Sequence, residues 1–163
     1  MRLKVGLRTQ QRVGRKLAWL SGNCLAHIAL VDNLATMTRK HVDSPRGPAA
    51  LGPYSAAVWA GDLLYLSGQT PVDPKTGALV DGDVEAQTHR AFDNLEAVLL
   101  DAGLTMDHVI KCNVYLTDMA SFPAMNSAYG MRFAKPYPAR TTVAVKALPK
   151  AAQVEIELVA RRA

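Results

Sequence analysis

Two side chains in the second half of the chain are suited to the chemistry of small acids. Arg140 stands at the start of an expected strand, and a planar guanidinium binds a carboxylate through two parallel hydrogen bonds. Glu155 stands between Val154 and Ile156, where partial burial would perturb the pKa of a carboxyl and suit it to proton transfer or to holding a water. Taken alone, each residue is more often a solvated surface group.

Three further polar residues are candidates because of where they fall in the expected elements. Tyr54 and Ser67 offer hydroxyls near the ends of the first two expected strands, and Asn126 offers an amide on the second expected helix. Such side chains often bond to the local backbone as caps and turns, which stays open as the alternative. Cys112 falls on the apolar side of its strand, which predicts a buried, inert thiol rather than a nucleophile.

Several common site types lack their signatures in this sequence. His41, His89 and His108 show no metal-ligand spacing, and Cys24 and Cys112 cannot form a CxxC site, so we predict no metal. The sequence contains no GxGxxG, GxxxxGK[ST] or GxSxG motif, which removes the usual anchors for dinucleotide, P-loop and serine-hydrolase function.

The composition indicates one soluble globular domain. The chain has 163 residues, 49% hydrophobic and 20% charged, and no apolar run reaches the roughly 18 residues of a membrane-spanning helix. Its net charge of +5 comes from residues 1–36, which carry six basic residues and one acidic residue, whereas residues 37–163 carry thirteen of each. A neutral domain, in a chain with 6% aromatic residues, argues against nucleic-acid binding as the main role.

Residues 1–36 are expected to form an N-terminal extension outside the fold, with the domain in residues 37–163. The extension resembles a secretory signal only weakly, because polar residues interrupt its apolar stretch. Its arginine spacing with almost no acid also resembles a mitochondrial transit peptide, but that composition is unspecific. Two cysteines fit a reducing compartment, so we expect a cytoplasmic protein, with organellar targeting as the open alternative.

Hydrophobic periodicity predicts five strands and two helices. The strands are expected at 56–60, 63–67, 109–116, 140–147 and 154–160, and the helices at 83–102 and from 121 to about 135. Gly61-Asp62 suits a two-residue type II′ hairpin turn between the first two strands, and residues 43–53 predict a loop. This order predicts an α+β fold with one sheet backed by two helices on one face.

The uncovered face of this sheet predicts self-association. In the strand at 140–147, Val143 is expected to face the core, with Arg140 and Thr142 on the open face beside Glu155. Ser121 is expected to cap the second helix through its hydroxyl. Because a second copy of the chain would cover the open face, we expect a symmetric oligomer.

The segments that carry these residues resemble the RidA (YjgF-type) family of reactive enamine/imine deaminases. They are GPYSAAV (52–58), LYLSGQTPVDPKTG (64–77), AFDNLEAVLLDAGLTMDHVIK (91–111), VYLTDM (114–119), MNSAY (125–129), YPARTTV (137–143) and VEIELVA (154–160). The resemblance implies a chorismate-mutase-like two-layer α+β protomer with a mixed sheet, assembled as a homotrimer with active sites between subunits. It also implies 2-iminobutanoate/2-iminopropanoate deaminase activity, which releases 2-keto acids and ammonia without a cofactor.

The resemblance also assigns roles to individual residues. It makes Arg140 the carboxylate-binding residue and Glu155 the residue that positions water, with Tyr54 as a third catalytic group. The substrate-binding positions that it implies, besides Arg140, are Ser67, Gly68, Asn126 and Thr142. Many relatives have a cysteine where this chain has Thr142, so thiol-based regulation is not expected here. The alternative is a trimer that binds small molecules, RNA or proteins without catalysis.

Overall fold

The structure is a computed structural model that describes residues 39–162. Its strands are β1 (Lys40–Val42), β2 (Ala57–Ala60), β3 (Leu63–Leu66), β4 (Val109–Leu116), β5 (Ala139–Ala144) and β6 (Val154–Arg161). Its helices are α2 (Val84–Asp101) and α3 (Phe122–Gly130), with single 3-10 turns at Met106–His108, Met119–Ser121 and Pro149–Ala151. The expected extension at residues 1–36, including Cys24, lies outside the described residues.

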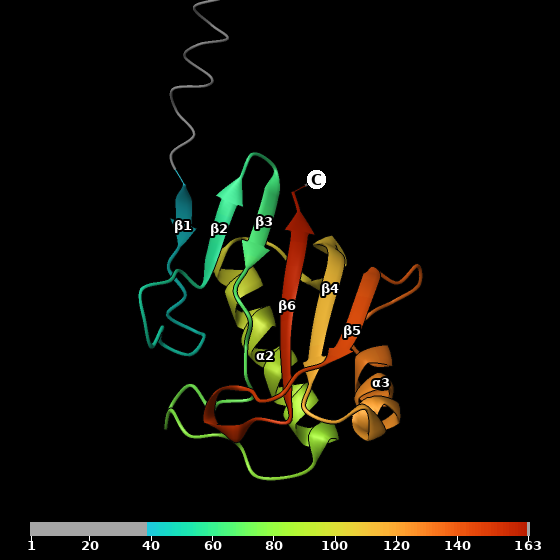
Figure 1. Cartoon of the computed structure of the whole chain (residues 1–163). Helices are drawn as coiled ribbons and strands as arrows, with labels where there is room; N and C mark the ends of the chain where they lie inside the picture. Colours follow the sequence, from blue (N-terminus) through green and yellow to red (C-terminus); the bar gives the residue numbers. More distant parts are fainter. Residues whose placement is uncertain (1–38, 163) are drawn as a thin grey trace, which may run out of the picture. The chain divides into compact units, whose positions relative to one another are not determined.

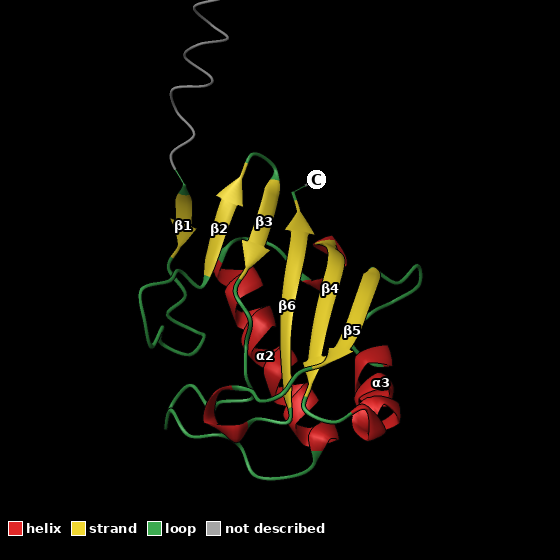
Figure 2. Ribbon diagram, in the orientation of Figure 1, coloured by secondary structure: helices red, strands yellow, loops and turns green. Residues whose placement is uncertain are grey.

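The six strands form one mixed sheet in the order β1-β2-β3-β6-β4-β5 (Figure 1). Only β4 and β5 pair in parallel, and the other neighbours are antiparallel. Because β6 is antiparallel to both β3 and β4, those two strands run in the same direction. Each helix therefore connects two strands that run in the same direction, and Figure 2 shows α2 passing behind the sheet.

The predicted α+β fold is confirmed, with one strand more than expected. β1 pairs with β2 at the edge of the sheet and has only three residues, Lys40–Val42, too few to show an alternating pattern. The β2–β3 hairpin forms where Gly61-Asp62 predicted it, and Gly61 takes a φ of 61° that glycine adopts without strain.

The core lies between α2 and the sheet. Asp83 begins the helix by accepting a hydrogen bond from the backbone N–H of Ala86 at 2.9 Å. The apolar face that the sequence predicted is buried, and it consists of Val84, Ala91, Leu95, Val98 and Leu99, joined by Phe92. The facing sheet residues include Leu64, Val114, Ile156 and Leu158, which are also buried. No helix within residues 39–162 has the length and apolar character needed to cross a membrane.

The second helix is shorter than predicted. α3 ends at Gly130 instead of near residue 135, and the hydroxyl of Ser121 makes no capping hydrogen bond. The capping oxygen comes one turn earlier, where Asp118 accepts a hydrogen bond from the N–H of Ala120 at 2.9 Å. Phe133 lies beyond the helix but still packs edge-on against Phe92, with ring centroids 5.6 Å apart. Aromatic packing therefore holds the segment that follows the end of the helix.

The side of β5 that faces the helices is the opposite of the predicted one. Arg140 is level with Cys112 of β4, which is level with Leu158 of β6. Cys112 and Leu158 are both buried beneath the helices, so Arg140 lies on the helix side of the sheet. Val143, in contrast, is 42% exposed on the open side.

Thr142 also lies on the helix side of the sheet, because it pairs with the buried Val114. The prediction that both residues lie on the open face beside Glu155 is therefore wrong. Alternation identifies which residues share a side of a strand, but not which side the helices cover. The ambiguity is greatest in an edge strand such as β5, where both sides keep partial access to solvent.

Candidate active site

The predicted site residues, except Thr142, fall into two different clefts of the chain. The first, which we call the glutamate half-site, has a volume of about 390 Å³ and is lined by Leu51, Gly52, Tyr54, Ser67, Gly68, Thr70, Pro149, Lys150 and Glu155. The second, which we call the arginine half-site, has a volume of about 260 Å³ and is lined by Asn126, Tyr129, Gly130, Tyr137, Pro138 and Arg140.

Glu155 is the acidic centre of the glutamate half-site. It projects from the open side of β6 between the buried Val154 and Ile156, and its carboxylate accepts no hydrogen bond from any residue in 39–162. Burial raises the pKa of Glu155, and the nearby negative charge of Glu157 adds to this effect. A carboxylate without a protein partner is free to hold a water and to accept its proton.

Gly68 allows the Glu155 carboxylate to lie directly against the backbone. A Cβ atom at position 68 would overlap the carboxylate, so any other residue would displace it. The resemblance named Gly68 for its backbone, and the structure shows why a side chain would not fit there.

The other polar groups of this half-site differ in exposure and in the hydrogen bonds that they already make within the protein. The Ser67 hydroxyl donates to the carbonyl of Ser55 at 2.7 Å, which is a bond to backbone 12 residues earlier in the chain and not the local cap or turn that the sequence left open. Tyr54 is 50% exposed, and its hydroxyl accepts a hydrogen bond from the Leu51 N–H at 3.4 Å. Lys150, which the sequence analysis missed, has a left-handed φ of 58° and donates to the carbonyl of Gly77 at 2.6 Å. Its side chain gave no sequence signal because it lies in the short 3-10 turn Pro149–Ala151, between β5 and β6.

Two aromatic rings contact the Arg140 guanidinium in the arginine half-site. Its guanidinium carbon lies 4.3 Å from the centre of the Tyr129 ring and 5.5 Å from that of Phe122. The guanidinium forms no ion pair or hydrogen bond with any described residue of the chain. The edge of the guanidinium is therefore available to an anion, and a planar carboxylate matches its fork.

Two buried hydroxyls beside Arg140 also lack partners within residues 39–162. They are Tyr129 Oη and Thr142 Oγ1. Burial raises the pKa of Tyr129 to about 12, so its phenol stays protonated at neutral pH. No role in the site was predicted for Tyr129, because its contact with Arg140 depends on how α3 is placed over β5.

Cys112 lies close to Arg140 but is buried, as predicted, and burial raises the pKa of its thiol to about 12. Asn126 is exposed on α3, at the rim of the arginine half-site.

The two half-sites do not meet within one chain. Arg140 is level with Leu158, three residues from Glu155 along β6, and β4 lies between β5 and β6. With about 4.8 Å between strands and about 3.3 Å per residue, their Cα atoms are roughly 14 Å apart. Their side chains also leave opposite sides of the sheet, so one small acid cannot touch both in the same chain.

Comparison with known proteins agrees with this architecture. A family model described as endoribonuclease L-PSP matches residues 45–162. A 2-iminobutanoate/2-iminopropanoate deaminase from Dermatophagoides farinae is 40% identical over 119 residues, covering 73% of this chain and 93% of the relative. The chain belongs to the RidA (YjgF) family. A relative with a different name, protein DfrA from Myxococcus xanthus, is 48% identical over 126 residues, covering 76% of this chain and 96% of that protein.

Solved RidA-family structures share the fold. RidA from a Psychrobacter species is 40% identical, with a TM-score of 0.73 over 76% of this chain and 100% of that one. TdcF from E. coli, solved with bound serine, is 37% identical, with a TM-score of 0.72 over 76% of this chain and 99% of that one. The expected chorismate-mutase-like α+β fold is thus confirmed.

Proposed function

We propose that this RidA-family protein is a 2-iminobutanoate/2-iminopropanoate deaminase that hydrolyses 2-imino and 2-enamino acids to 2-keto acids and ammonia without a cofactor. The observation that carries the proposal is the pair of complementary groups without protein partners, the Arg140 guanidinium and the Glu155 carboxylate, each in an open cleft. Two relatives named as such deaminases, at 40% and 39% identity, support it.

The active unit in this proposal is a homotrimer in which the arginine half-site of one subunit meets the glutamate half-site of the next. The separation of Arg140 from Glu155 within one chain supports this arrangement. The open side of the sheet supports it too, because it exposes Tyr65 and Val143 at 49% and 42%, as an uncovered interface would.

The reaction requires orientation more than activation, because an imine carbon is already electrophilic. Arg140 binds the substrate carboxylate, and the Tyr129 ring lies against its guanidinium. Glu155 accepts a proton from a water whose oxygen adds to the imine carbon, and the imine nitrogen becomes an amine by protonation. The hydroxyl proton of the carbinolamine then passes through Glu155 to the amine nitrogen, which leaves as ammonia, so the oxygen of the water becomes the keto oxygen. The Tyr54 phenol assists these proton transfers.

A coupled assay with the full chain tests the proposal. A threonine or serine dehydratase generates the imine, and its disappearance is followed against keto-acid formation. We expect the protein to accelerate the decay and Arg140→Ala to reduce kcat/KM about a hundredfold or more. Arg140→Lys, which keeps the charge but loses the fork, should recover only part of this loss. Unchanged activity in Arg140→Ala would remove the carboxylate-binding role.

Two other results would replace the proposal. Binding of keto acids without any faster imine decay would indicate a ligand-binding trimer. Strongly salt-dependent RNA affinity would indicate an RNA-binding protein. The balance of thirteen basic and thirteen acidic residues in 37–163 does not favour RNA.

A further inference from the structure

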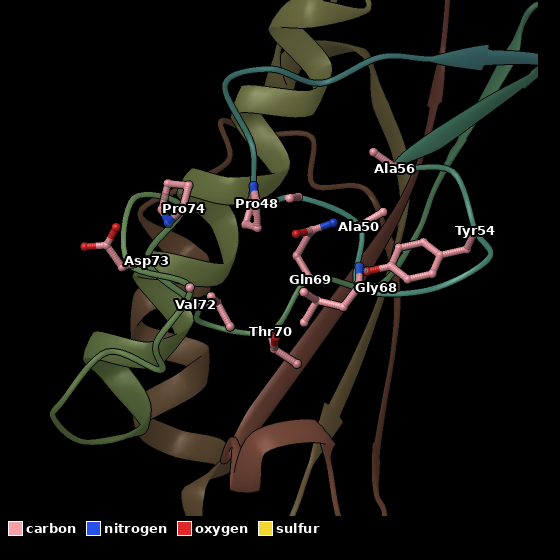
Figure 3. Close-up of a pocket in the computed structure, with 13 residues that line it drawn as sticks. Pro48, Ala50, Tyr54, Ala56, Gly68, Gln69, Thr70, Val72, Asp73 and Pro74 are labelled. Atoms are coloured by element: carbon pink, nitrogen blue, oxygen red, sulfur yellow. Dashed lines mark hydrogen bonds between the residues drawn. The ribbon is translucent and has the colours of Figure 1, made fainter.

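A further cavity, of about 120 Å³, opens beside the glutamate half-site (Figure 3). Its walls come from residues 48–51, before β2, and from residues 69–77, after β3. Leu51, Tyr54, Gly68 and Thr70 line both spaces, so the cavity adjoins the glutamate half-site. The reaction steps assigned to Arg140 and Glu155 do not use it.

Gln69 places an unpartnered amide in this cavity. The residue is only 7% exposed, and its backbone N–H donates to the carbonyl of Ile156 at 2.8 Å. Its side-chain amide, in contrast, forms no hydrogen bond with any residue in the described part of the chain. Figure 3 shows the amide pointing toward Pro48 and Ala50, across the space that the lining residues enclose. The amide atoms stay accessible from the cavity, where a ligand can replace solvent as their hydrogen-bond partner.

The walls are held in place by the protein itself. Asn94 of α2 is 2% exposed, and its amide donates to the carbonyls of Thr70 at 3.1 Å and Val72 at 2.9 Å. The Gly77 N–H donates to the carbonyl of Asp73 at 2.8 Å, which closes the loop on the far side. A ligand that enters this cavity does not have to order its walls first.

Size and polarity indicate what fits. At about 30 Å³ for a water-sized group, the cavity has room for about four non-hydrogen atoms. Most of its wall is apolar or small, including Pro48, Ala49, Ala50 and Val72. Asp73 is the only charged lining residue, so a terminal carboxylate on the ligand is disfavoured.

We propose that this cavity receives the side chain of the imine substrate and favours one of about four non-hydrogen atoms that ends in a neutral amide. This inference rests on the proposed deaminase function and specifies its substrate class. The imine of asparagine fits the description, with its terminal amide paired to that of Gln69. The leucine imine has the same branched shape without polar atoms, and the alanine imine leaves the cavity empty.

A substrate comparison tests the proposal with the full-length protein. A broad-specificity L-amino-acid oxidase, with catalase present, generates the imines of asparagine, leucine and alanine, and the decay of each is measured with and without the protein. We expect kcat/KM for the asparagine imine to exceed that for the alanine imine about tenfold, with the leucine imine between them.

Two cavity variants and one control sharpen the comparison. Gln69→Leu should lower the asparagine-to-leucine ratio of kcat/KM about tenfold, because the wall loses its hydrogen-bonding group at similar size. Ala50→Leu should fill the space and lower kcat/KM for the asparagine and leucine imines relative to that for the alanine imine. Gln153→Leu makes the same change outside the cavity and should leave the ratios as in wild type. Melting curves identify any variant that fails to fold.

The outcomes separate this proposal from the one it rests on. If the alanine imine is hydrolysed but the ratios are the same in wild type, Gln69→Leu and Ala50→Leu, the side-chain cavity is overturned and the deaminase stands. If no imine decays faster with the wild-type protein, the deaminase function itself is overturned.

Discussion

Arg140 and Glu155 leave opposite sides of the same sheet, three residues apart in register and with β4 between their strands. The two groups that the chemistry needs together are therefore kept apart within each chain. Each has a cleft of its own and no protein partner among the described residues.

Two inactive variants should restore activity when they share an oligomer. Arg140→Ala chains and Glu155→Gln chains, co-expressed with different tags and purified as mixed oligomers, should form sites with one intact arginine and one intact glutamate. In a mixed trimer, whether 2:1 or 1:2, one of the three sites has both intact groups, so the purified mixed oligomers should show about a third of wild-type activity. Each variant expressed alone is the control. Mixed oligomers as inactive as the single variants would show that each site lies within one chain.

Adding one methyl group at Gly68 should impair catalysis with little effect on folding. Gly68→Ala places a Cβ where the Glu155 carboxylate lies, so the carboxylate must move and kcat should fall more than about tenfold. Gly52→Ala is the matched control in the same cleft, because its Cβ would make only ordinary contacts of 3.7 Å with Tyr54. Steady-state kinetics and melting temperatures of the two variants distinguish the effects, and equal rates would count against the placement of Glu155.

The pH profile should report the raised pKa of Glu155. As a base, Glu155 must be ionised, so activity should fall with decreasing pH at a higher midpoint than an ordinary glutamate would give. Glu157→Gln removes the repulsion that adds to the burial effect, so this midpoint should move to lower pH without reaching the ordinary value. Asp107→Asn, at the opposite end of β4, should leave it in place. An unmoved midpoint in Glu157→Gln would assign the acid limb to another group.

Tyr129 should matter for its ring more than for its hydroxyl. Tyr129→Phe keeps the stacking on Arg140 and removes a buried hydroxyl without a partner, so KM should change little and stability should rise by up to about 1 kcal/mol. Tyr129→Leu removes the stacking surface, and KM should rise about five- to tenfold. Kinetics and thermal unfolding of both variants check this. A large KM increase in Tyr129→Phe would instead show that the hydroxyl binds substrate.

The sequence predicted those elements whose pattern depends on local physics. The buried stripe of α2 repeats over five turns, and Gly61-Asp62 suits only a few turn types, so both were correctly identified. β1 was missed because Lys40–Val42 is too short to show a period, and α3 was overextended because Phe133 keeps the helical spacing without the helix.

The arrangement of the site depends on contacts between distant segments, which one sequence does not display. Placing Arg140 on the helix side requires knowing that α3 lies against the edge strand, where Tyr129 meets the guanidinium. Separating Arg140 from Glu155 requires knowing that β6, the last strand, inserts between β3 and β4. The residue types were identifiable from the sequence and the family resemblance, but their division into two clefts was not.

A site divided between two unlike surfaces also restricts the symmetry of any assembly that completes it. Joining an arginine half-site to a glutamate half-site is a head-to-tail contact, so a pair of chains joined once still has one free half of each kind. Such contacts either close into a ring, where every chain both gives and receives, or continue into an open fibre. Ring closure yields as many complete sites as there are chains.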